Sequence, residues 1–320
     1  MSLMKKALFV GLSLCFSAVS ATASAQETTK VVIGMSGWTG FAPLTLAQKA
    51  GFFKKHGLDV DIKFLPVKDR LLAYASGSLQ CVATTIDSFI AWNANNVPVT
   101  QIFMLDASHG ADGIAVRNDV NDIKELKGKT IAVETAGASP YFLLSYMMHK
   151  NGIKMSEIKT NTLSPQAAAQ AFNAGQVDVA MSYEPYLSTV RENEKGGKIL
   201  ATTVEYPAII DFVGCNPTWL KDNPKAGYAL VAGYSDALDM IKNDPKEAYT
   251  IMGAEVKQSA EQFEKSASFL TWKTKEDSRE YFKNDIIPFM KEATDILIDT
   301  KVIRKAPADL NALFDATYVN

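Results

Sequence analysis

The stretch Val31–Ile62, VVIGMSGWTGFAPLTLAQKAGFFKKHGLDVDI, decides the fold that this sequence predicts. A β-branched run leads into a glycine-rich turn around Trp38 and Thr39. Pro43 then begins a helical pattern, because the missing N–H of a proline costs nothing in a first helical turn. Gly57 follows this pattern, and alternating polar and apolar residues predict a second strand. The stretch therefore predicts a βαβ unit whose polar turn lies at the carboxyl end of a strand, where open α/β sheets bind ligands.

The first 25 residues have the pattern of a secretory signal peptide. Lys5 and Lys6 precede an apolar core, and the small residues that end at Ala25 predict cleavage there. We therefore expect a periplasmic mature chain and leave this segment out of the fold. The whole chain has 33 basic and 35 acidic residues, and losing the two lysines makes it slightly more acidic. This charge balance gives no support for nucleic-acid binding, which needs a basic surface.

Strand and helix patterns alternate in two blocks along the mature chain, and a helical tail follows them. Such blocks predict an α/β protein with two open-sheet lobes. The chain would cross between the lobes twice, near 111–117 and 208–214. We expect lobe 1 to comprise residues 26–111 plus 214–320, including the helical tail, and lobe 2 to comprise residues 112–213.

Cys81 and Cys215 remain after cleavage of the signal segment. Export permits a disulfide, but Cys81 lies in an apolar run that reads as a strand, so we favour a buried free thiol. The pairing stays open, because the distance between two cysteines cannot be read from sequence.

Loops that follow the predicted strands would face a cleft between the lobes. They carry aromatic, hydroxyl and carboxylate side chains and no Lys or Arg. Several carboxylates in one small cleft would repel an anion, so we favour a neutral or cationic nitrogenous ligand, such as a urea, guanidine or pyrimidine-like molecule. We expect eight residues to contact it: Trp38, Thr39, Thr85, Asp87, Ser139, Tyr141, Glu184 and Asp211.

Asp87 and Glu184 would receive the positive or donor end of this ligand, and Ser139 its acceptor end. The alternative is an anion, because predicted helix starts at Thr85 and Ser139 offer free N–H groups to a sulfonate or nitrate. The same side chains also have structural interpretations. Acids after strands often cap helices, a glutamate before a helix complements its dipole, and Trp38 could be a packed wall.

Enzyme motifs are scarce in this sequence. It has no nucleophile elbow, P-loop or dinucleotide-binding fingerprint. The scattered histidines do not pair with a cysteine or with each other at metal-ligand spacing. We therefore expect a protein that is not an enzyme and has no metal or cofactor.

A set of short motifs resembles the nitrate/sulfonate/taurine-type substrate-binding proteins of bacterial ABC importers. The motifs are Ala42-Pro43-Leu44, Gly51-Phe52-Phe53, Gly57-Leu58-Asp59-Val60, Ser76-Gly77-Ser78-Leu79, Leu126-Lys127-Gly128-Lys129, Ser139-Pro140 and Glu184-Pro185-Tyr186. The resemblance implies the type II periplasmic binding protein fold with two crossover segments. It also implies a receptor, which we expect to be monomeric, that delivers a small ligand to an ABC permease in the inner membrane.

This family does not fix the ligand, because it also includes members that bind riboflavin-pathway and thiamine-precursor pyrimidines. The turn Gly37-Trp38-Thr39-Gly40 and the segment 182–186 most resemble members linked to urea or guanidine utilisation. A related pyrimidine synthase of thiamine biosynthesis is an enzyme on the same fold. That enzyme relies on a cysteine-rich iron-binding motif, which this chain lacks.

Overall fold

The computed structural model describes residues 28–193 and 195–320. The predicted signal segment and its cleavage site after Ala25 lie outside these residues. Within the described part of the chain, no helix is both long enough and apolar enough to span a membrane.

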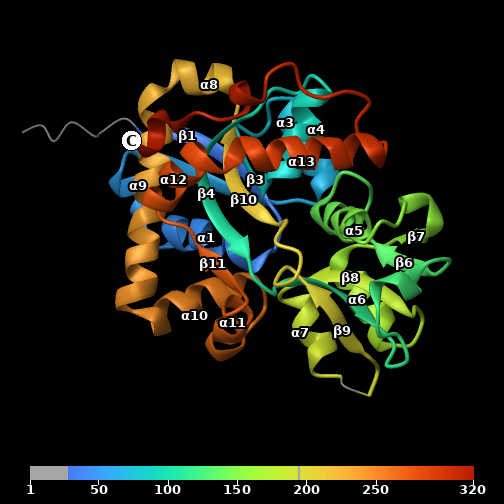
Figure 1. Cartoon of the computed structure of the whole chain (residues 1–320). Coiled ribbons are helices and arrows are strands. Elements are labelled where there is room, and N and C mark those ends of the chain that lie inside the picture. Colours follow the sequence, from blue (N-terminus) through green and yellow to red (C-terminus); the bar gives the residue numbers. More distant parts are fainter. Residues whose placement is uncertain (1–27, 194) are drawn as a thin grey trace, which may run out of the picture.

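Two β-sheets form the centres of two lobes (Figure 1). The sheet of lobe 1 has the order β11-β4-β10-β3-β1-β2, and that of lobe 2 has the order β7-β6-β8-β5-β9. The strands of lobe 1 are β1 (Thr29–Met35), β2 (Leu58–Phe64), β3 (Cys81–Thr85), β4 (Thr100–Ser108), β10 (Ile210–Cys215) and β11 (Leu270–Trp272). The strands of lobe 2 are β5 (Asp112–Val116), β6 (Thr130–Val133), β7 (Lys159–Thr162), β8 (Val179–Tyr183) and β9 (Lys198–Thr202). The predicted two-lobed α/β fold is therefore confirmed.

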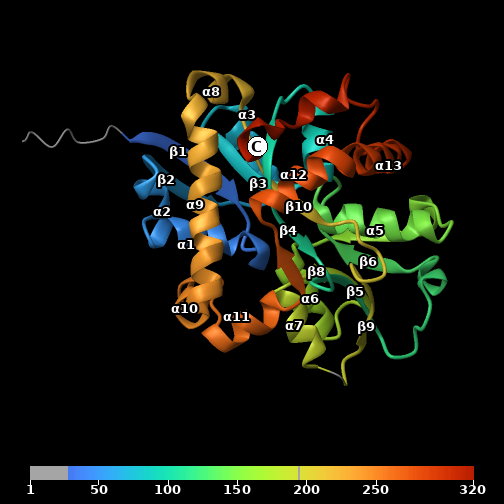
Figure 2. The same ribbon diagram turned by 60° about the vertical axis from the view of Figure 1, so that its left-hand side comes forward.

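Helices cover both sheets (Figures 1 and 2). Those of lobe 1 are α1 (Ala42–Lys49), α2 (Phe52–Lys55), α3 (Val67–Ala75), α4 (Ile86–Ala94), α8 (Pro217–Asp222), α9 (Pro224–Asn243), α10 (Pro245–Glu255), α11 (Ala260–Ala267), α12 (Lys275–Asn284) and α13 (Ile286–Asp299). Those of lobe 2 are α5 (Ser139–Lys150), α6 (Pro165–Asn173) and α7 (Tyr186–Arg191). Short 3-10 turns are η1 (Thr39–Phe41), η2 (Ile123–Leu126), η3 (Met155–Glu157), η4 (Leu310–Leu313) and η5 (Ala316–Val319).

The opening βαβ unit forms as the periodicity predicts. Strands β1 and β2 pair in parallel along their whole length, from Thr29 opposite Leu58 to Met35 opposite Phe64. The connecting helix is broken in two at Gly51, whose φ of 78° lies in the left-handed region that favours glycine. This break turns the chain between α1 and α2, so that both can pack along the long helix α9 (Figure 2).

The chain crosses between the lobes after β4 and again after β9. The first crossing is residues 109–111 and the second is residues 203–209. The sequence places residues up to 213 in lobe 2, but β10 pairs with β3 and β4 and so belongs to the sheet of lobe 1. An extended run shows that a strand forms but not which sheet it joins, and this is why the expected boundary differs.

One strand lies within the tail that the sequence describes as helical. Strand β11 follows α11 and forms one edge of the sheet by pairing antiparallel with β4, with Trp272 opposite Asp106. The indole of Trp272 donates to the carbonyl oxygen of Gly40 at 3.1 Å. This short strand therefore fixes the glycine-rich turn after β1 against the edge of the sheet.

Cys81 and Cys215 form a disulfide. The two residues lie directly opposite each other on the antiparallel strands β3 and β10, and both side chains are buried. The expectation of a free thiol at Cys81 is therefore wrong, because the register between two strands that lie far apart in sequence brings the two sulfur atoms together.

Replacing both cysteines by alanine should lower the free energy of unfolding by about 2 to 5 kcal/mol. The bond closes a loop with a sequence separation of 134, so its loss gives the unfolded chain much more conformational freedom. Urea unfolding of the variant and of the oxidised parent would measure the difference. A reductant should lower the Tm of the parent and leave that of the variant unchanged; equal sensitivity of both would contradict this account.

Candidate functional site

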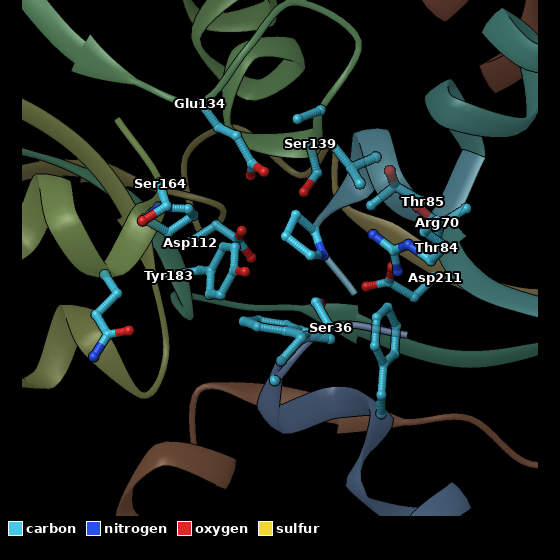
Figure 3. Close-up of a pocket in the computed structure, with 18 of the residues that line it drawn as sticks. Ser36, Arg70, Thr84, Thr85, Asp112, Glu134, Ser139, Ser164, Tyr183 and Asp211 are labelled. Carbon is cyan, nitrogen blue, oxygen red and sulfur yellow. The ribbon is translucent and has the colours of Figure 1, made fainter. Parts of the chain in front are cut away.

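A cavity of about 330 Å³ lies between the two lobes (Figure 3). This volume is at the small end of the range for ligand pockets. Lobe 1 supplies the turn after β1, the segment from the end of β2 into α3, and the start of α4; lobe 2 supplies the loops before α5 and α6 and the end of β8. Its polar lining residues are Ser36, Trp38, Arg70, Thr84, Thr85, Asp112, Glu134, Ser139, Ser164, Gln166, Tyr183, Tyr186 and Asp211.

Four of the eight residues that the sequence selects line this cavity. They are Trp38, Thr85, Ser139 and Asp211. Thr85 is the N-cap residue of α4, as expected, whereas Ser139 is the first residue of α5 and Ala138 is the cap. Trp38 follows β1 and Asp211 lies in β10, so four separate segments converge on the cavity.

The other four selected residues lie elsewhere. Thr39 and Asp87 are completely buried beside the cavity and do not line it. Tyr141 lies in the first turn of α5, two residues after Ser139, and lines a different hollow, between α5 and the end of α13. Glu184 is completely buried, and its carboxylate accepts from the backbone N–H of Ser188 at 3.0 Å, at the start of α7. That geometry matches the structural interpretation of Glu184 as an acid at a helix start.

Arg70 brings a cation into the cavity that the loops do not supply. It lies on α3, is 4% exposed, and donates from Nη1 to the carbonyl oxygen of Ala83. Its Nε has no hydrogen-bond partner among the described residues. Gly34 leaves room for this side chain, since a Cβ there would lie 3.2 Å from the Arg70 Cγ.

A helical signal in the sequence could have identified Arg70. The buried residues of α3 are Val67, Arg70 and Tyr74, at positions i, i+3 and i+7 of one face. An arginine on an otherwise apolar helix face must find a buried partner or line a cavity. Restricting the search to loops after strands excluded this residue.

Asp106 and Asp211 form a buried pair of carboxyl groups, of which Asp211 lines the cavity. They lie opposite each other on β4 and β10, and the indole of Trp38 donates to Asp106 Oδ1 at 3.1 Å. Burial raises the pKa of Asp106, and burial together with the neighbouring Asp106 and Asp112 raises that of Asp211. Two adjacent buried carboxyl groups cannot both ionise easily, so the pair holds a proton above the usual range of an aspartic acid.

Two further acids reach the cavity from lobe 2. Asp112 is 2% exposed, and burial raises its pKa to about 7. Its Oδ2 has no hydrogen-bond partner in the described part of the chain. Burial also raises the pKa of Glu134, while the charge of Arg70 acts in the opposite direction. Figure 3 shows both carboxyl groups pointing into the open space from the side opposite Arg70 and Asp211.

Aromatic rings join the two lobes along the cavity wall. The rings of Trp38 in lobe 1 and Tyr183 in lobe 2 meet edge to face, with centroids 5.4 Å apart. Tyr186 packs against Tyr183 at 5.8 Å. The cavity thus offers aromatic faces, several acids, hydroxyl groups and one guanidinium. Across the described residues, no group of three or more His, Cys, Asp or Glu side chains is placed to hold a metal ion.

A family model described as NMT1/THI5 like matches residues 38–248. The chain belongs to this NMT1/THI5-like family. It is 29% identical over 165 residues to the taurine-binding periplasmic protein of Escherichia coli, which covers 51% of this chain and 50% of that protein. It is also 25% identical over 332 residues to a Bacillus subtilis protein whose name provisionally assigns it to aliphatic sulfonates, with 99% of this chain and 96% of that protein covered.

Solved structures of similar shape support the fold of this NMT1/THI5-like chain. The periplasmic aliphatic sulphonate binding protein of Escherichia coli superposes with a TM-score of 0.73 at 18% identity, over 89% of this chain and 91% of that one. The alkanesulfonate-binding protein of Xanthomonas axonopodis, solved with MOPS bound, gives 0.70 at 18% identity, over 88% and 96%. The fold is therefore that of the periplasmic binding proteins.

Gly40→Ala in this NMT1/THI5-like protein should disrupt the cavity wall and lower stability by about 1 to 3 kcal/mol. A Cβ at this position would lie 2.2 Å from Asp106 Oδ2 and 2.3 Å from Trp38 Nε1, so the hydrogen bond between them must break. Thermal unfolding and tryptophan fluorescence would report the change. Gly37→Ala is the matched control, because its Cβ would meet only the Tyr186 hydroxyl, at 3.6 Å. Equal effects of the two substitutions would contradict this packing account.

The buried acids should make the protein less stable as the pH rises from about 4 to about 7. Asp112 has a pKa of about 7 in the folded protein and an ordinary value of 3.8, so the unfolded chain releases its proton first. Each such proton contributes a slope of about 1.4 kcal/mol per pH unit in this window. Urea unfolding across the window should show a flatter decline for Asp112→Asn, with the exposed Asp239→Asn as control. Identical slopes for both variants would refute this assignment.

Proposed function

We propose that this protein is the solute-binding component of an ABC importer. It would capture a small polar molecule between its lobes in the periplasm and present it to a permease, without turning it over. The family membership, the two-lobed fold and the cavity between the lobes support this proposal. Relatives named as binding proteins, among them the taurine-binding periplasmic protein of Escherichia coli, support it further. Ligand contacts from both lobes would favour the closed form.

We infer that the ligand is a small nitrogenous molecule that presents N–H donors or a positive charge. The observation that carries this inference is the excess of acids in the cavity. Asp112, Glu134 and Asp211 all line it, against the single cation of Arg70. Asp112 Oδ2 is a buried acceptor that no described residue satisfies. A urea, guanidine or pyrimidine-like ligand could supply the missing donor.

The aromatic wall suits the same class of ligand. Trp38 and Tyr183 expose ring faces or edges along the cavity, and a flat cation gains from contact with such rings. Arg70 and the hydroxyl of Ser139 would receive the acceptor atoms of the ligand, such as a urea oxygen or a ring nitrogen. In this arrangement the donor end faces Asp112 and Glu134, which take the role that the sequence gave to Asp87 and Glu184.

A sulfonate, taurine or nitrate is the second candidate. One specific observation favours it: the Nε of Arg70 is buried in the cavity wall without a partner among the described residues. Guanidinium groups bind sulfonate-like anions through paired N–H donors. The names of the sulfonate-binding and taurine-binding relatives point in the same direction.

Titration calorimetry with guanidinium, urea and an aminopyrimidine, beside taurine, an alkanesulfonate and nitrate, would separate the two classes. We expect a nitrogenous ligand to bind, and Asp112→Asn to weaken it about tenfold or more, because the variant loses a charged acceptor. Affinity for a cationic ligand should rise between pH 6 and pH 8, as Asp112 loses its proton.

Arg70→Gln provides the opposite test. It should affect a nitrogenous ligand less than Asp112→Asn does, whereas a bound sulfonate should depend on Arg70 above all. Binding of alkanesulfonates alone, abolished by Arg70→Gln and unaffected by Asp112→Asn, would overturn the nitrogenous assignment and establish the second candidate. No binding by any of these compounds would count against both classes.

A further inference from the structure

Arg191, the last residue of α7, makes three contacts in three different parts of the molecule. Its Nε donates to Glu184 Oε1 at 3.2 Å, and its Nη2 donates to the carbonyl oxygen of Gly110 at 2.5 Å. Its guanidinium carbon also lies 4.3 Å from the centre of the Phe269 ring. Glu184 belongs to lobe 2, Gly110 to the first crossing, and Phe269 to the segment of lobe 1 before β11.

Arg191 lies at the hinge between the lobes, which consists of the two crossings, residues 109–111 and 203–209. Gly110 has a φ of 103°, which favours glycine, and its N–H donates to the Thr203 hydroxyl of the second crossing at 2.8 Å. The backbone carbonyl of Phe269 accepts from the N–H of His109, also in the first crossing, at 2.8 Å. Both crossings and a loop of lobe 1 therefore meet where the guanidinium lies.

The helices on either side of this point are neighbours in both overall views (Figures 1 and 2). Helix α7 of lobe 2 lies next to α11 of lobe 1, and Lys265 forms an ion pair with Glu192 between them at 3.1 Å. Both side chains of that pair are more than half exposed, so it contributes little stability. The side chain of Arg191 is only 22% exposed, so its stacking on Phe269 and its hydrogen bond to Gly110 are the better shielded link from α7 to lobe 1 and the first crossing.

We propose that Arg191 is a positioning residue, a hinge clasp that holds lobe 2 against lobe 1 and sets the angle between them. The effect of this clasp on ligand affinity rests on the proposed function. Only in a protein that closes on a ligand would fixing the angle between the lobes change the affinity. The clasp itself is a property of the ligand-free chain. It needs an arginine, since the planar guanidinium stacks on a ring and donates in two directions at once, and a lysine cannot do both.

Arg117 provides a matched control within the same chain. Its guanidinium carbon lies 4.1 Å from the centre of the Phe172 ring, and its Nη2 donates to the carbonyl oxygen of Phe172 at 2.9 Å. It also donates to the carbonyl oxygens of Val177 and Gly196. All of these partners belong to lobe 2. Arg117 thus combines the same kinds of contact as Arg191 but links nothing across the hinge.

The test compares Arg191→Lys with Arg117→Lys in the ligand-free protein. For Arg191→Lys we expect a larger radius of gyration in small-angle scattering. We also expect about tenfold faster hydrogen exchange of the Gly110 and Glu184 amides, which report opening of the hinge. The Glu184 amide is informative because it donates to the carbonyl oxygen of Ala111 in the first crossing, at 2.9 Å. Arg117→Lys should lower Tm and leave both readouts unchanged.

Phe269→Leu is a second variant that tests the same contact without changing Arg191. It removes the ring beneath the guanidinium and keeps the ion pair between Arg191 and Glu184. It should shift scattering and exchange in the same direction as Arg191→Lys, by a smaller amount. If both variants keep the parent's radius and exchange rates, or if Arg117→Lys changes them equally, the clasp is refuted. No ligand is needed, so that result would leave the proposed function standing, and failure to bind any solute would leave the clasp standing.

Discussion

The pairing of β10 between β3 and β4 is the constraint on which the rest of this structure depends. The chain leaves lobe 1 after β4, builds the whole of lobe 2, and returns as β10 to join β3 to β4, which do not pair with each other. Its antiparallel register places Asp211 opposite both Thr85 and Asp106 at one end and Cys215 opposite Cys81 at the other. One strand therefore closes the sheet, supplies an acid to the cavity and carries half of the disulfide. The double crossing that makes a hinge follows from the same topology.

The cavity wall contains both acids and an arginine, and burial acts against the charged form of each. Several carboxyl groups are removed from water around one guanidinium, and burial favours their neutral forms. The Trp38 indole stabilises the ionised form of Asp106, and Arg70 does the same for Asp211 and Glu134. The net charge of the lining can therefore change near neutral pH. A ligand with a positive charge would lower the pKa values of the acids and favour their ionised forms. Binding of such a ligand would therefore release protons.

Local periodicity was enough to predict the βαβ unit, the two lobes and the two crossings, because these depend on short stretches with a clear period. It could not predict the pairing of β10 or the disulfide, since both depend on the register between strands far apart in sequence. The site divides in the same way. Trp38, Thr85 and Ser139 were predicted because each lies at or after the carboxyl end of a parallel strand in one of the two sheets. Arg70 was missed because it reaches the cavity from a helix face, and the positions of Asp87 and Glu184 depend on which side of a helix start is buried.

Arg117 and Arg191 make contacts of the same chemical kinds but connect different parts of the molecule. Each places a guanidinium over a phenylalanine ring and donates to a backbone carbonyl and a carboxylate. Counted as contacts, the two are equivalent contributions to stability. They differ in what they connect: the partners of Arg117 all lie in lobe 2, whereas those of Arg191 lie in two lobes and the crossing between them. A contact within a rigid body can only stabilise it, while a contact across a hinge also selects one angle from the range that the hinge allows. The functional weight of a residue in a two-lobed protein therefore depends on topology as much as on bonding.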